Sequence, residues 1–390
     1  MHILIIPSYY PSRVQRLTGI FVERQANALH KAGHQVGVLV TPRFSTTREQ
    51  IQLDGLKSLR ATTRESIFTD YPVYRMHWGW FPRPLPPIVA WLLEKAGMRA
   101  FEHYVRAHGK PDILHPHNTF FGGYLAARIG AKHDIPVILT EHSSSFLENL
   151  VIFPGQEQIA RYTLKHSAAR IVVGRSLVRA LHRYAPDVPI EVIGNVINTD
   201  TFTPDDRVLS ASPFVLGVIA QLRERRKGFE ILIEAFHRAF GGKDALLKIR
   251  GDGPMRAQVD AHIARLNLTS QVEFIPRLSD AEMCDFINNC HVIVSSSHVE
   301  TFAVSVAEGM ACGKPIVATI SGGPEDYVTP EAGILVPPGD ADALAQALMQ
   351  MRENYALYNP KVIRQLCVDQ FSEGALVRNL ESIYTSALRR

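Results

Sequence analysis

The hydrophobic pattern of the chain alternates, in both halves, between short apolar runs and longer amphipathic stretches. The apolar runs have the length of buried strands, and the stretches between them have the period of helices. We expect strands at 2–7, 34–40, 111–117, 135–142, 169–176, 213–220, 245–253, 272–278 and 290–297, and helices at 19–33, 122–134, 227–242, 254–268 and 279–289. Such alternation is typical of parallel sheets covered by helices. The sequence therefore predicts an α/β protein with two doubly wound, Rossmann-like domains.

A segment without this alternation of strands and helices separates the two halves of the chain. Residues 194–213 are polar, show no periodicity and end at Pro213. We therefore expect an N-terminal domain at 1–195, a linker at 196–212 and a C-terminal domain at 213–370, with a last helix at about 371–390 that packs back onto the first domain. Ligands of open α/β sheets bind beyond the carboxyl ends of the strands. The two domains are therefore expected to face each other across a ligand-binding cleft.

The stretch SSSHVETFAVSVAEGMACGKPIVA, residues 295–318, places two carboxylates in an otherwise apolar region. Glu300 lies in the loop after an expected strand, and Glu308 lies on the short helix that follows. The amides of Thr301, Phe302 and the next residues would be unpaired donors at a helix N-terminus, where phosphate binds well. Carboxylates there would accept hydrogen bonds from hydroxyl groups, so a nucleotide-sugar fits. The alternative is that both glutamates pair with lysine or arginine at a domain edge.

Composition narrows the class of protein. The chain has 390 residues, of which 46% are hydrophobic and 21% charged, as in soluble globular proteins. A net charge of +4 is too small to indicate nucleic acid as a partner. The four cysteines show no paired metal-ligand spacing and are expected to be free thiols in a reducing compartment. Neither a signal peptide nor an apolar span of membrane length is evident, so we expect a cytoplasmic protein.

The segment 74–101 holds all three tryptophans, Trp78, Trp80 and Trp91, among prolines and arginines. Three interpretations stay open. The segment can be ordinary packing between elements, a pocket for an acceptor substrate, or a surface that contacts the inner face of a membrane. Tryptophan together with lysine and arginine suits an anionic headgroup boundary, which would make the protein a peripheral membrane protein.

Several motifs resemble those of glycosyltransferase family 4, the retaining nucleotide-sugar glycosyltransferases of the GT-B fold, over essentially the whole chain. ETFAVSVAE, residues 300–308, matches the family's Glu-x7-Glu signature and is followed by GMACGKPIVAT and by Gly322-Gly323. The segments VIGNVINTDTF, RGDGPMR, DILHPHNTFFGG and LTEHSSSF are similar to the family's hinge entry, nucleotide turn and acceptor-domain loops. The resemblance implies that the C-terminal domain binds a nucleotide-diphosphate sugar and the N-terminal domain binds the acceptor.

The resemblance also implies roles for charged residues. Glu300 would bind hydroxyls of the transferred sugar, Glu308 the nucleotide ribose, and Lys227 the diphosphate. The family places an arginine before this lysine, but the spacing in QLRERRKG differs from the usual one. Arg223 is the best match. The competing matches are Arg225 and Arg226, and a solvated basic turn is the remaining alternative.

Further residues follow from the same resemblance. Gly19 would let the backbone approach the sugar phosphate, and His142 would orient a sugar hydroxyl or relay a proton as a neutral imidazole. The other expected substrate-binding residues are Asn195, Gly251, Arg277, Ala303 and Val304. Enzymes of this fold generally work without a metal, so neither metal nor cofactor is expected. His115 and His117 share one face of a strand end but lack a third metal ligand.

The resulting hypothesis is a retaining hexosyltransferase. It would move a hexose from a UDP-sugar or GDP-mannose to a hydroxyl of a saccharide or lipid-linked saccharide, in cell-surface polysaccharide biosynthesis. No carboxylate is placed as a nucleophile, so the resemblance implies front-face attack, with the leaving phosphate taking the acceptor proton. Two alternatives remain: a non-catalytic regulator that binds nucleotide-sugars, and a dinucleotide-dependent oxidoreductase. The second lacks support, because neither IIPSYYPSR nor GDGPMR carries the dinucleotide glycine fingerprint.

Overall fold

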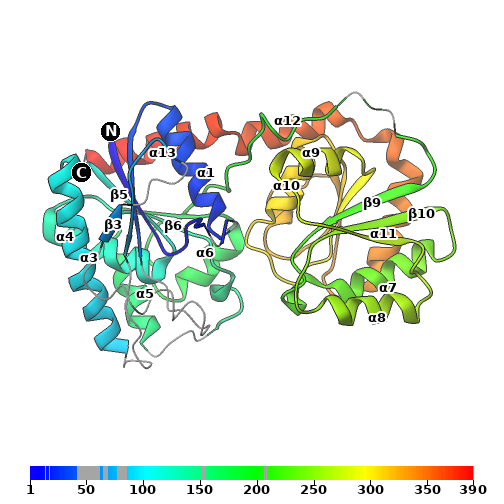
Figure 1. The fold of residues 1–390 in the computed structure, drawn as a ribbon, viewed down its shortest axis with the longest axis horizontal. Coiled ribbons are helices and arrows are strands. Elements are labelled where there is room, and N and C mark those ends of the chain that lie inside the picture. The colour runs from blue at the N-terminus through cyan, green and yellow to red at the C-terminus, as the bar shows by residue number, and fades with distance from the viewer. Residues whose placement is uncertain are drawn as a thin grey trace. The chain divides into compact units, whose positions relative to one another are not determined.

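The structure is a computed structural model that describes residues 1–13, 15–16, 18–41, 62–64, 69–76, 86–150, 155–205, 207 and 209–389. The chain divides into two compact units (Figure 1). The first comprises Met1–Val173, Leu177–Val196 and Leu376–Arg390, and the second comprises Gly174–Ser176 and Ile197–Ala375. Each unit is a sheet with covering helices, so the predicted fold class, two doubly wound Rossmann-like domains, is confirmed.

The sheet of the first unit has the strand order β3-β4-β2-β1-β5-β6-β7-β8 among the described residues. Only β3 runs antiparallel to its neighbour there. The strands are β1 (His2–Pro7), β2 (Gln35–Val40), β3 (Thr62–Arg64), β4 (Val73–Met76), β5 (Ile113–His117), β6 (Ile138–Glu141), β7 (Ala169–Val172) and β8 (Glu191–Val192). The helices are α1 (Ile20–Lys31), α3 (Pro86–His108), α4 (Tyr124–His133), α5 (Gln156–Lys165), α6 (Arg175–His182) and α13 (Glu373–Leu388).

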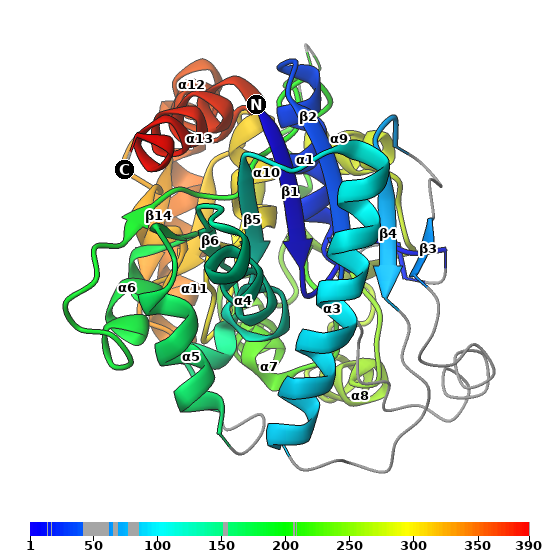
Figure 2. The same ribbon diagram turned by 90° about the vertical axis from the view of Figure 1, so that its left-hand side faces the viewer.

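The central strands of this sheet are buried on both faces, which explains their continuous apolar runs. Ile3 and Ile5 of β1 pack into a core with α1 and α13, whereas Leu4 and Ile6 pack into a second core with α3 and α4. Figure 2 shows β1, β2 and β4 side by side, with α3 lying along them. The sequence pattern predicted α1 and α4 closely, because their polar and apolar positions follow the helical period.

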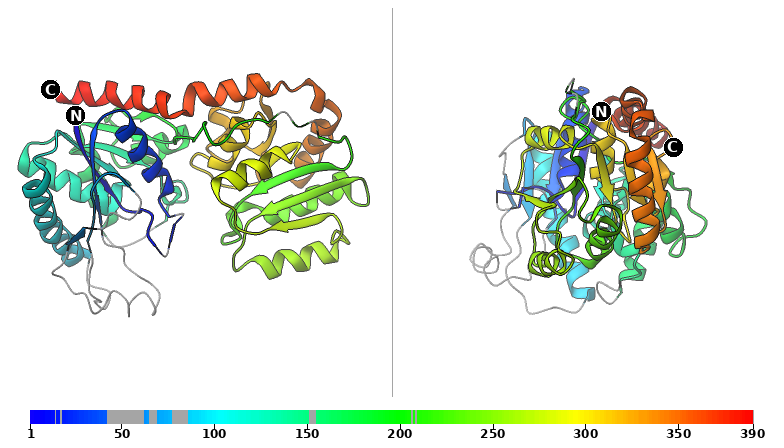
Figure 3. Two further views of the ribbon diagram at one scale, coloured as in Figure 1. Left: turned by 45° about the horizontal axis from the view of Figure 1, so that its top comes forward. Right: turned by 90° about the vertical axis from the view of Figure 1, so that its right-hand side faces the viewer.

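The last helix of the chain, α13, completes the first unit. Leu376, Leu380, Ile383 and Tyr384 are buried in the core that contains α1. The imidazole Nε2 of His34 lies 2.9 Å from a carboxylate oxygen of Glu381. Figure 3 shows α13 beside the N-terminus of the chain. The two ends of the sequence therefore belong to one core.

The sheet of the second unit has the order β11-β10-β9-β12-β13-β14, and its neighbouring strands are parallel. The strands are β9 (Phe214–Ile219), β10 (Ala245–Arg250), β11 (Val272–Ile275), β12 (Val292–Ser295), β13 (Ile316–Thr319) and β14 (Gly333–Val336). The helices are α7 (Phe229–Phe240), α8 (Arg256–Arg265), α9 (Asp280–Asn288), α10 (Val304–Ala311), α11 (Ala341–Asn354) and α12 (Pro360–Phe371). The strand order reverses between β9 and β12. This is the topological switch point, where ligands of such sheets bind.

The segment expected as a linker, residues 196–212, divides differently. Val196 groups with the first unit, and Ile197–Ala375 group with the second. Phe202 is fully buried, and the guanidinium of Arg364 in α12 donates to the carbonyl oxygens of Thr199 and Phe202 at 2.9 and 2.7 Å. Polar composition suggested a linker, and a side chain of the second unit binds its carbonyl groups at Thr199 and Phe202.

The tryptophan-rich segment is only partly described. Trp78, Trp80 and Arg83 lie outside the described residues. Trp91 of α3 is 52% exposed, and Lys95 Nζ lies 4.1 Å from the centre of its ring. In the part of the chain that the structure describes, no helix is long and apolar enough to cross a membrane.

Candidate active site

A lysine and a glutamate meet at the switch point of the second unit. Lys227 follows β9 in a short turn, and Glu300 follows β12. Lys227 Nζ donates to Glu300 Oε1 at 2.6 Å, and Ser297 Oγ donates to the same oxygen at 2.7 Å. Both charged side chains are largely buried, at 20% and 13% exposure. The sequence placed Lys227 and Glu300 in one site, and the structure brings them into direct contact.

The Lys227 turn is attached to the loop after β12 by backbone contacts. Ser296 Oγ donates to the carbonyl oxygen of Lys227 at 3.0 Å, and the amide of His298 donates to the carbonyl oxygen of Arg226 at 2.7 Å. Gly228 has φ of 65°, and a Cβ at this position would lie 2.1 Å from the carbonyl oxygen of Ser296. Only glycine combines this left-handed conformation with such a close approach.

The Glu300 loop is held from its other side by Gly322 and Gly323. The amide of Glu300 donates to the carbonyl oxygen of Ser321 at 2.8 Å. A Cβ on Gly322 would lie 2.6 Å from the carbonyl oxygen of Glu300, and one on Gly323 would lie 2.7 Å from the backbone of Phe302. The two glycines that follow the Glu-x7-Glu signature thus fix the backbone around Glu300.

The N-terminus of the helix with Glu308 presents other amides than we expected. Ala303 has φ of 66° and caps α10, so Val304 is the first helical residue. Thr301 and Phe302 therefore precede the helix, and their amides are not its N-terminal donors. The Phe302 ring is buried against Tyr327, at 5.3 Å between ring centres. The apolar pattern could not reveal this left-handed residue.

The N-terminus of α10 nevertheless faces the switch point with unpaired donors. The amides of Val304 and Ser305 donate no hydrogen bond within the described part of the chain. The hydroxyl of Tyr327 lies 2.7 and 2.9 Å from the carbonyl oxygens of Phe302 and Ala303, which fixes the cap. Free amides and the helix dipole together favour an anion at this end.

Glu308 lies further along α10 and is buried, and Arg250 is its electrostatic neighbour. Arg250 is the last residue of β10 and is 7% exposed. Burial lowers the pKa of its guanidinium and the neighbouring Arg277 acts in the same direction, whereas Glu308 and Asp280 oppose this shift. Sequence reasoning missed Arg250. The available signal was a charged residue that ends an apolar strand.

The other expected residues of this unit surround these groups. Gly251 follows Arg250, and a Cβ there would lie 1.8 Å from the carbonyl oxygen of Ala220. Arg277 is exposed beyond β11. Of the three arginines before Lys227, Arg223 and Arg225 are exposed, whereas Arg226 is half-buried and its guanidinium donates to the carbonyl oxygen of Val299 at 3.4 Å. The structure therefore places the Arg226 side chain in contact with the Glu300 loop.

In the first unit, His142 belongs to a buried row of histidines. His117 Nδ1 lies 2.9 Å from His142 Nε2, and the rings of His115 and His117 are stacked. His115 Nδ1 lies 2.5 Å from the hydroxyl of Tyr384 in α13. Burial lowers the pKa of His115 and of His142 to about 3, and it lowers that of His117 as well. The row is therefore neutral at ordinary pH.

Glu141 supports the loop that carries His142, and sequence reasoning missed it. This carboxylate is fully buried. It accepts hydrogen bonds from Asn118 Nδ2 at 3.0 Å and from the amides of Thr119, His142 and Ser143 at 2.6, 2.8 and 2.7 Å. A glutamate at the end of an apolar strand was the available signal. Glu141 joins the two loops that resemble the family's acceptor-domain loops.

The two remaining expected residues also lie in the first unit. Gly19 caps α1 with φ of 73°, and a Cβ there would lie 2.3 Å from the carbonyl oxygen of Tyr9, so the local backbone requires glycine. Asn195 interacts with His142 and opposes the effect of burial on the pKa of that imidazole. In the described ranges, no group of three or more His, Cys, Asp or Glu side chains is arranged to hold a metal ion.

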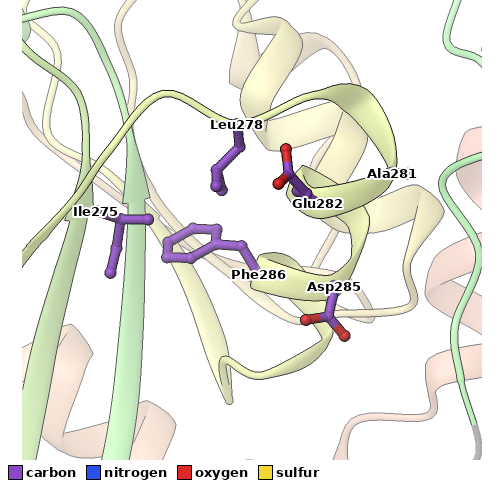
Figure 4. A pocket seen from close by; sticks show the side chains of 6 residues that line it. All are labelled: Ile275, Leu278, Ala281, Glu282, Asp285 and Phe286. Carbon is purple, nitrogen blue, oxygen red and sulfur yellow. The ribbon is translucent and has the colours of Figure 1, made fainter.

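A shallow groove of about 530 Å³ lies elsewhere on the second unit, beside its edge strand β11. Figure 4 shows the ring of Phe286 pointing from α9 toward Ile275, with Leu278 close by. Ala281, Glu282 and Asp285 complete the lining. The groove includes neither the Lys227–Glu300 pair nor Glu308, so it is separate from the candidate site.

Comparison with known proteins identifies the family. Residues 18–201 match the model described as Glycosyltransferase Family 4, and residues 202–361 match the model described as Glycosyl transferases group 1. The chain belongs to glycosyltransferase family 4. The transferase carries the family's Glu-x7-Glu signature at Glu300 and Glu308, which the structure places at the switch point of the second unit. The family expected from the sequence is thereby confirmed.

Relatives extend over the full length of the transferase. A protein of Bacillus subtilis named as a candidate teichuronic acid biosynthesis glycosyltransferase, TuaC, is 24% identical over 100% of this chain and 99% of its own. Sucrose-phosphate synthase from Thermosynechococcus elongatus has a TM-score of 0.78 at 19% identity and covers 100% of both chains. Anabaena HepE, solved in complex with UDP-glucose, has a TM-score of 0.71 at 16% identity and covers 99% of this chain and 100% of its own. These structures share the GT-B fold with the transferase.

Proposed function

We propose that this transferase moves a hexose from a nucleoside-diphosphate sugar to a hydroxyl of a saccharide or lipid-linked saccharide, with retention of anomeric configuration. The observation that carries the proposal is the Lys227–Glu300 pair beside the N-terminus of α10. HepE, which binds UDP-glucose, supports a nucleotide-sugar donor. TuaC supports a role in cell-surface polysaccharide synthesis.

The diphosphate of the donor would lie between Lys227 and α10. An ammonium group has three N–H donors, and Glu300 accepts one of those of Lys227. The others remain for phosphate oxygens, together with the amides of Val304 and Ser305. Positive charge placed there stabilises the negative charge that develops on the leaving nucleotide. No metal is required for this role in the proposal.

The transferred sugar would contact Glu300. Its Oε1 accepts from Lys227 and Ser297, whereas Oε2 accepts no hydrogen bond from the residues that the structure describes. A carboxylate oxygen that is held in place and still has lone pairs is suited to accept from sugar hydroxyls. Glu308, deeper along α10, would accept from the ribose hydroxyls.

The transfer step would proceed on one face of the sugar. The bond from the anomeric carbon to the phosphate oxygen breaks, the acceptor oxygen forms the new bond on the same face, and its proton passes to the leaving phosphate. Because Glu300 is already bound to Lys227, it is suited to hold the sugar rather than to attack the anomeric carbon. Retention by this route needs no covalent intermediate with the protein.

The acceptor would bind on the first unit, beside His142. The buried histidine row keeps this imidazole neutral, so it can donate or accept one hydrogen bond without carrying charge. Glu141 fixes the backbone of the same loop through the His142 amide. His142 would therefore position a hydroxyl, with Asn195 beside it.

A donor-hydrolysis assay tests this function. The full chain is incubated with UDP-glucose, UDP-galactose, UDP-N-acetylglucosamine and GDP-mannose, and the released nucleotide and sugar are followed by proton NMR. We expect slow hydrolysis of one donor, with the α-anomer of the sugar appearing before mutarotation. An initial β-anomer would contradict retention. Nucleotide binding without any turnover, also with added saccharide acceptors, would favour the non-catalytic regulator.

A further inference from the structure

A buried arginine in the second unit has a guanidinium nitrogen without a hydrogen-bond partner among the described residues. Arg250 is 7% exposed, and the nitrogen is its Nε. Its guanidinium forms no ion pair or hydrogen bond with the residues that the structure describes. A buried polar or charged group without a partner costs free energy, so it indicates that a ligand supplies the acceptor. Glu308 influences its charge without pairing with it.

The position of Arg250 indicates which part of a ligand it meets. The strands are ordered β11-β10-β9-β12, with Lys227 after β9 and Glu300 after β12. Arg250 ends β10, on the side of β9 that faces away from β12, and Arg277 follows β11 beyond it. A donor whose diphosphate lies at the β9–β12 switch point would therefore extend its nucleoside toward Arg250.

We infer that Arg250 binds the nucleobase of the donor and selects guanine. This inference rests on the proposed function, because it assigns the base of the proposed donor. A guanidinium offers five N–H donors and no acceptor. Guanine presents two adjacent acceptors, O6 and N7, which a guanidinium can contact together. Adenine places an amino donor beside N7, and uracil offers single carbonyl acceptors, so both complement Arg250 less well.

Binding of GDP, UDP and ADP to the full chain tests the inference by calorimetry. We expect the wild type to bind GDP at least about 10-fold more tightly than UDP or ADP. Arg250→Met should weaken GDP binding roughly 10- to 100-fold, the range for loss of a bidentate base contact, and change UDP binding less than about 3-fold. Arg250→Lys, which keeps the charge but not the planar fork, should lose most of the preference for GDP.

Controls separate the inference from the proposed function. Arg265→Met removes an exposed arginine of α8, outside the candidate site, and should leave the GDP preference unchanged. Circular dichroism and the thermal midpoint confirm that each variant is folded. Equal weakening of all three nucleotides in Arg250→Met and Arg250→Lys would assign the residue to the ribose or diphosphate and overturn the inference. A wild-type preference for UDP or ADP would overturn it as well. Absence of binding by all three nucleotides would overturn the donor site itself.

Discussion

At the residue scale, the candidate site depends on a few charged side chains whose burial requires specific partners. Lys227 is 20% exposed and bound to Glu300, so its charge acts in a partly desolvated site. Electrostatic interactions are stronger there than in bulk water. Substitutions at Lys227, Glu300 and Glu308 should therefore separate nucleotide binding from transfer.

Lys227→Ala should lower the rate of donor turnover by about 10²–10³-fold, the effect of losing one preorganised electrostatic donor. The measurement is the initial rate of nucleotide release from the preferred donor at saturating concentration. Lys361→Ala removes an exposed lysine of α12, outside the candidate site, and is the matched control. If both variants lost activity to the same small extent, the turn would be only a solvated basic segment.

Glu308→Gln and Glu300→Gln should have opposite effects. Loss of the charge-assisted hydrogen bond between Glu308 and the ribose should weaken binding of the nucleoside diphosphate by about 1.5–3 kcal/mol. Glu300→Gln should leave that affinity near normal and reduce transfer strongly, because its partner is the sugar. Calorimetric titration with the nucleoside diphosphate, combined with turnover rates, distinguishes the two. Normal nucleotide affinity in Glu308→Gln would contradict the ribose assignment.

The family's motifs assigned roles to Glu300, Glu308 and Lys227, and the structure brings Lys227 and Glu300 into contact. Sequence reasoning did not single out Arg250 or Glu141. Both residues end apolar strands. The hydrophobic pattern indicates that these strands are buried, but it does not show what the charged side chain at the end of each strand contacts. The contacts of Glu141 with Thr119 and Asn118 join loops more than twenty residues apart, since they are separated by 22 and 23 positions.

At the element scale, glycines determine how the loops of the second unit approach each other. Gly228 joins the Lys227 turn to α7 with φ of 65°, and a Cβ there would lie 2.1 Å from Ser296 O. Gly228→Ala should therefore displace Lys227 from Glu300, reduce turnover and lower the thermal midpoint. Gly242→Ala is a control with a similar φ of 69° but no atom within 4 Å of the added methyl. Equal effects from both substitutions would show that φ alone, not the contact with Ser296, is responsible.

The histidine row makes the stability of the first unit depend on pH. The folded pKa of His115 is about 3, below its unfolded value of 6.5, so its contribution to stability is complete above pH 6.5 and is lost as the pH falls. Between pH 7 and pH 5, His115 alone should cost about 2 kcal/mol of unfolding free energy. Urea titrations at the two pH values measure this loss. His115→Gln should reduce the pH dependence, and an unchanged dependence would show that the row does not control it.

Element positions were more predictable than element ends. The apolar pattern gave the strands and helices around the switch point. We expected the amides of Thr301 and Phe302 at the N-terminus of α10. Ala303 instead caps that helix in a left-handed conformation that is uncommon for alanine. The polar segment after Val196 also looked free, although Arg364 binds its carbonyl groups.

At the scale of the whole molecule, the last helix ties the end of the chain to the core of the first unit. Leu380 is 1% exposed among residues of α1 and β1, so Leu380→Ala should lower the unfolding free energy by about 2–5 kcal/mol. Leu388→Ala, at 45% exposure in the same helix, should have little effect. Chemical unfolding followed by circular dichroism measures both. Equal losses would contradict the role of α13 in this core.

The helical pattern of the last residues indicates that one face is buried, but it does not specify the partner of that face. Tyr384 lies against His115, which is 269 positions earlier in the chain. Contacts between such distant residues follow from topology rather than from local sequence. The family's motifs indicated a donor domain and an acceptor domain. They do not identify the acceptor, which requires experiment.

Hydrogen–deuterium exchange of the full chain, with and without its preferred nucleoside diphosphate, tests the location of the donor site most directly. We expect slower exchange in residues 223–228, 250–253 and 296–308, which contain Lys227, Arg250 and the N-terminal part of α10. Lys227→Ala with Glu308→Gln should reduce that protection at equal nucleotide concentration. Protection confined to the first unit, residues 1–173, or to the groove between β11 and α9 would contradict the account.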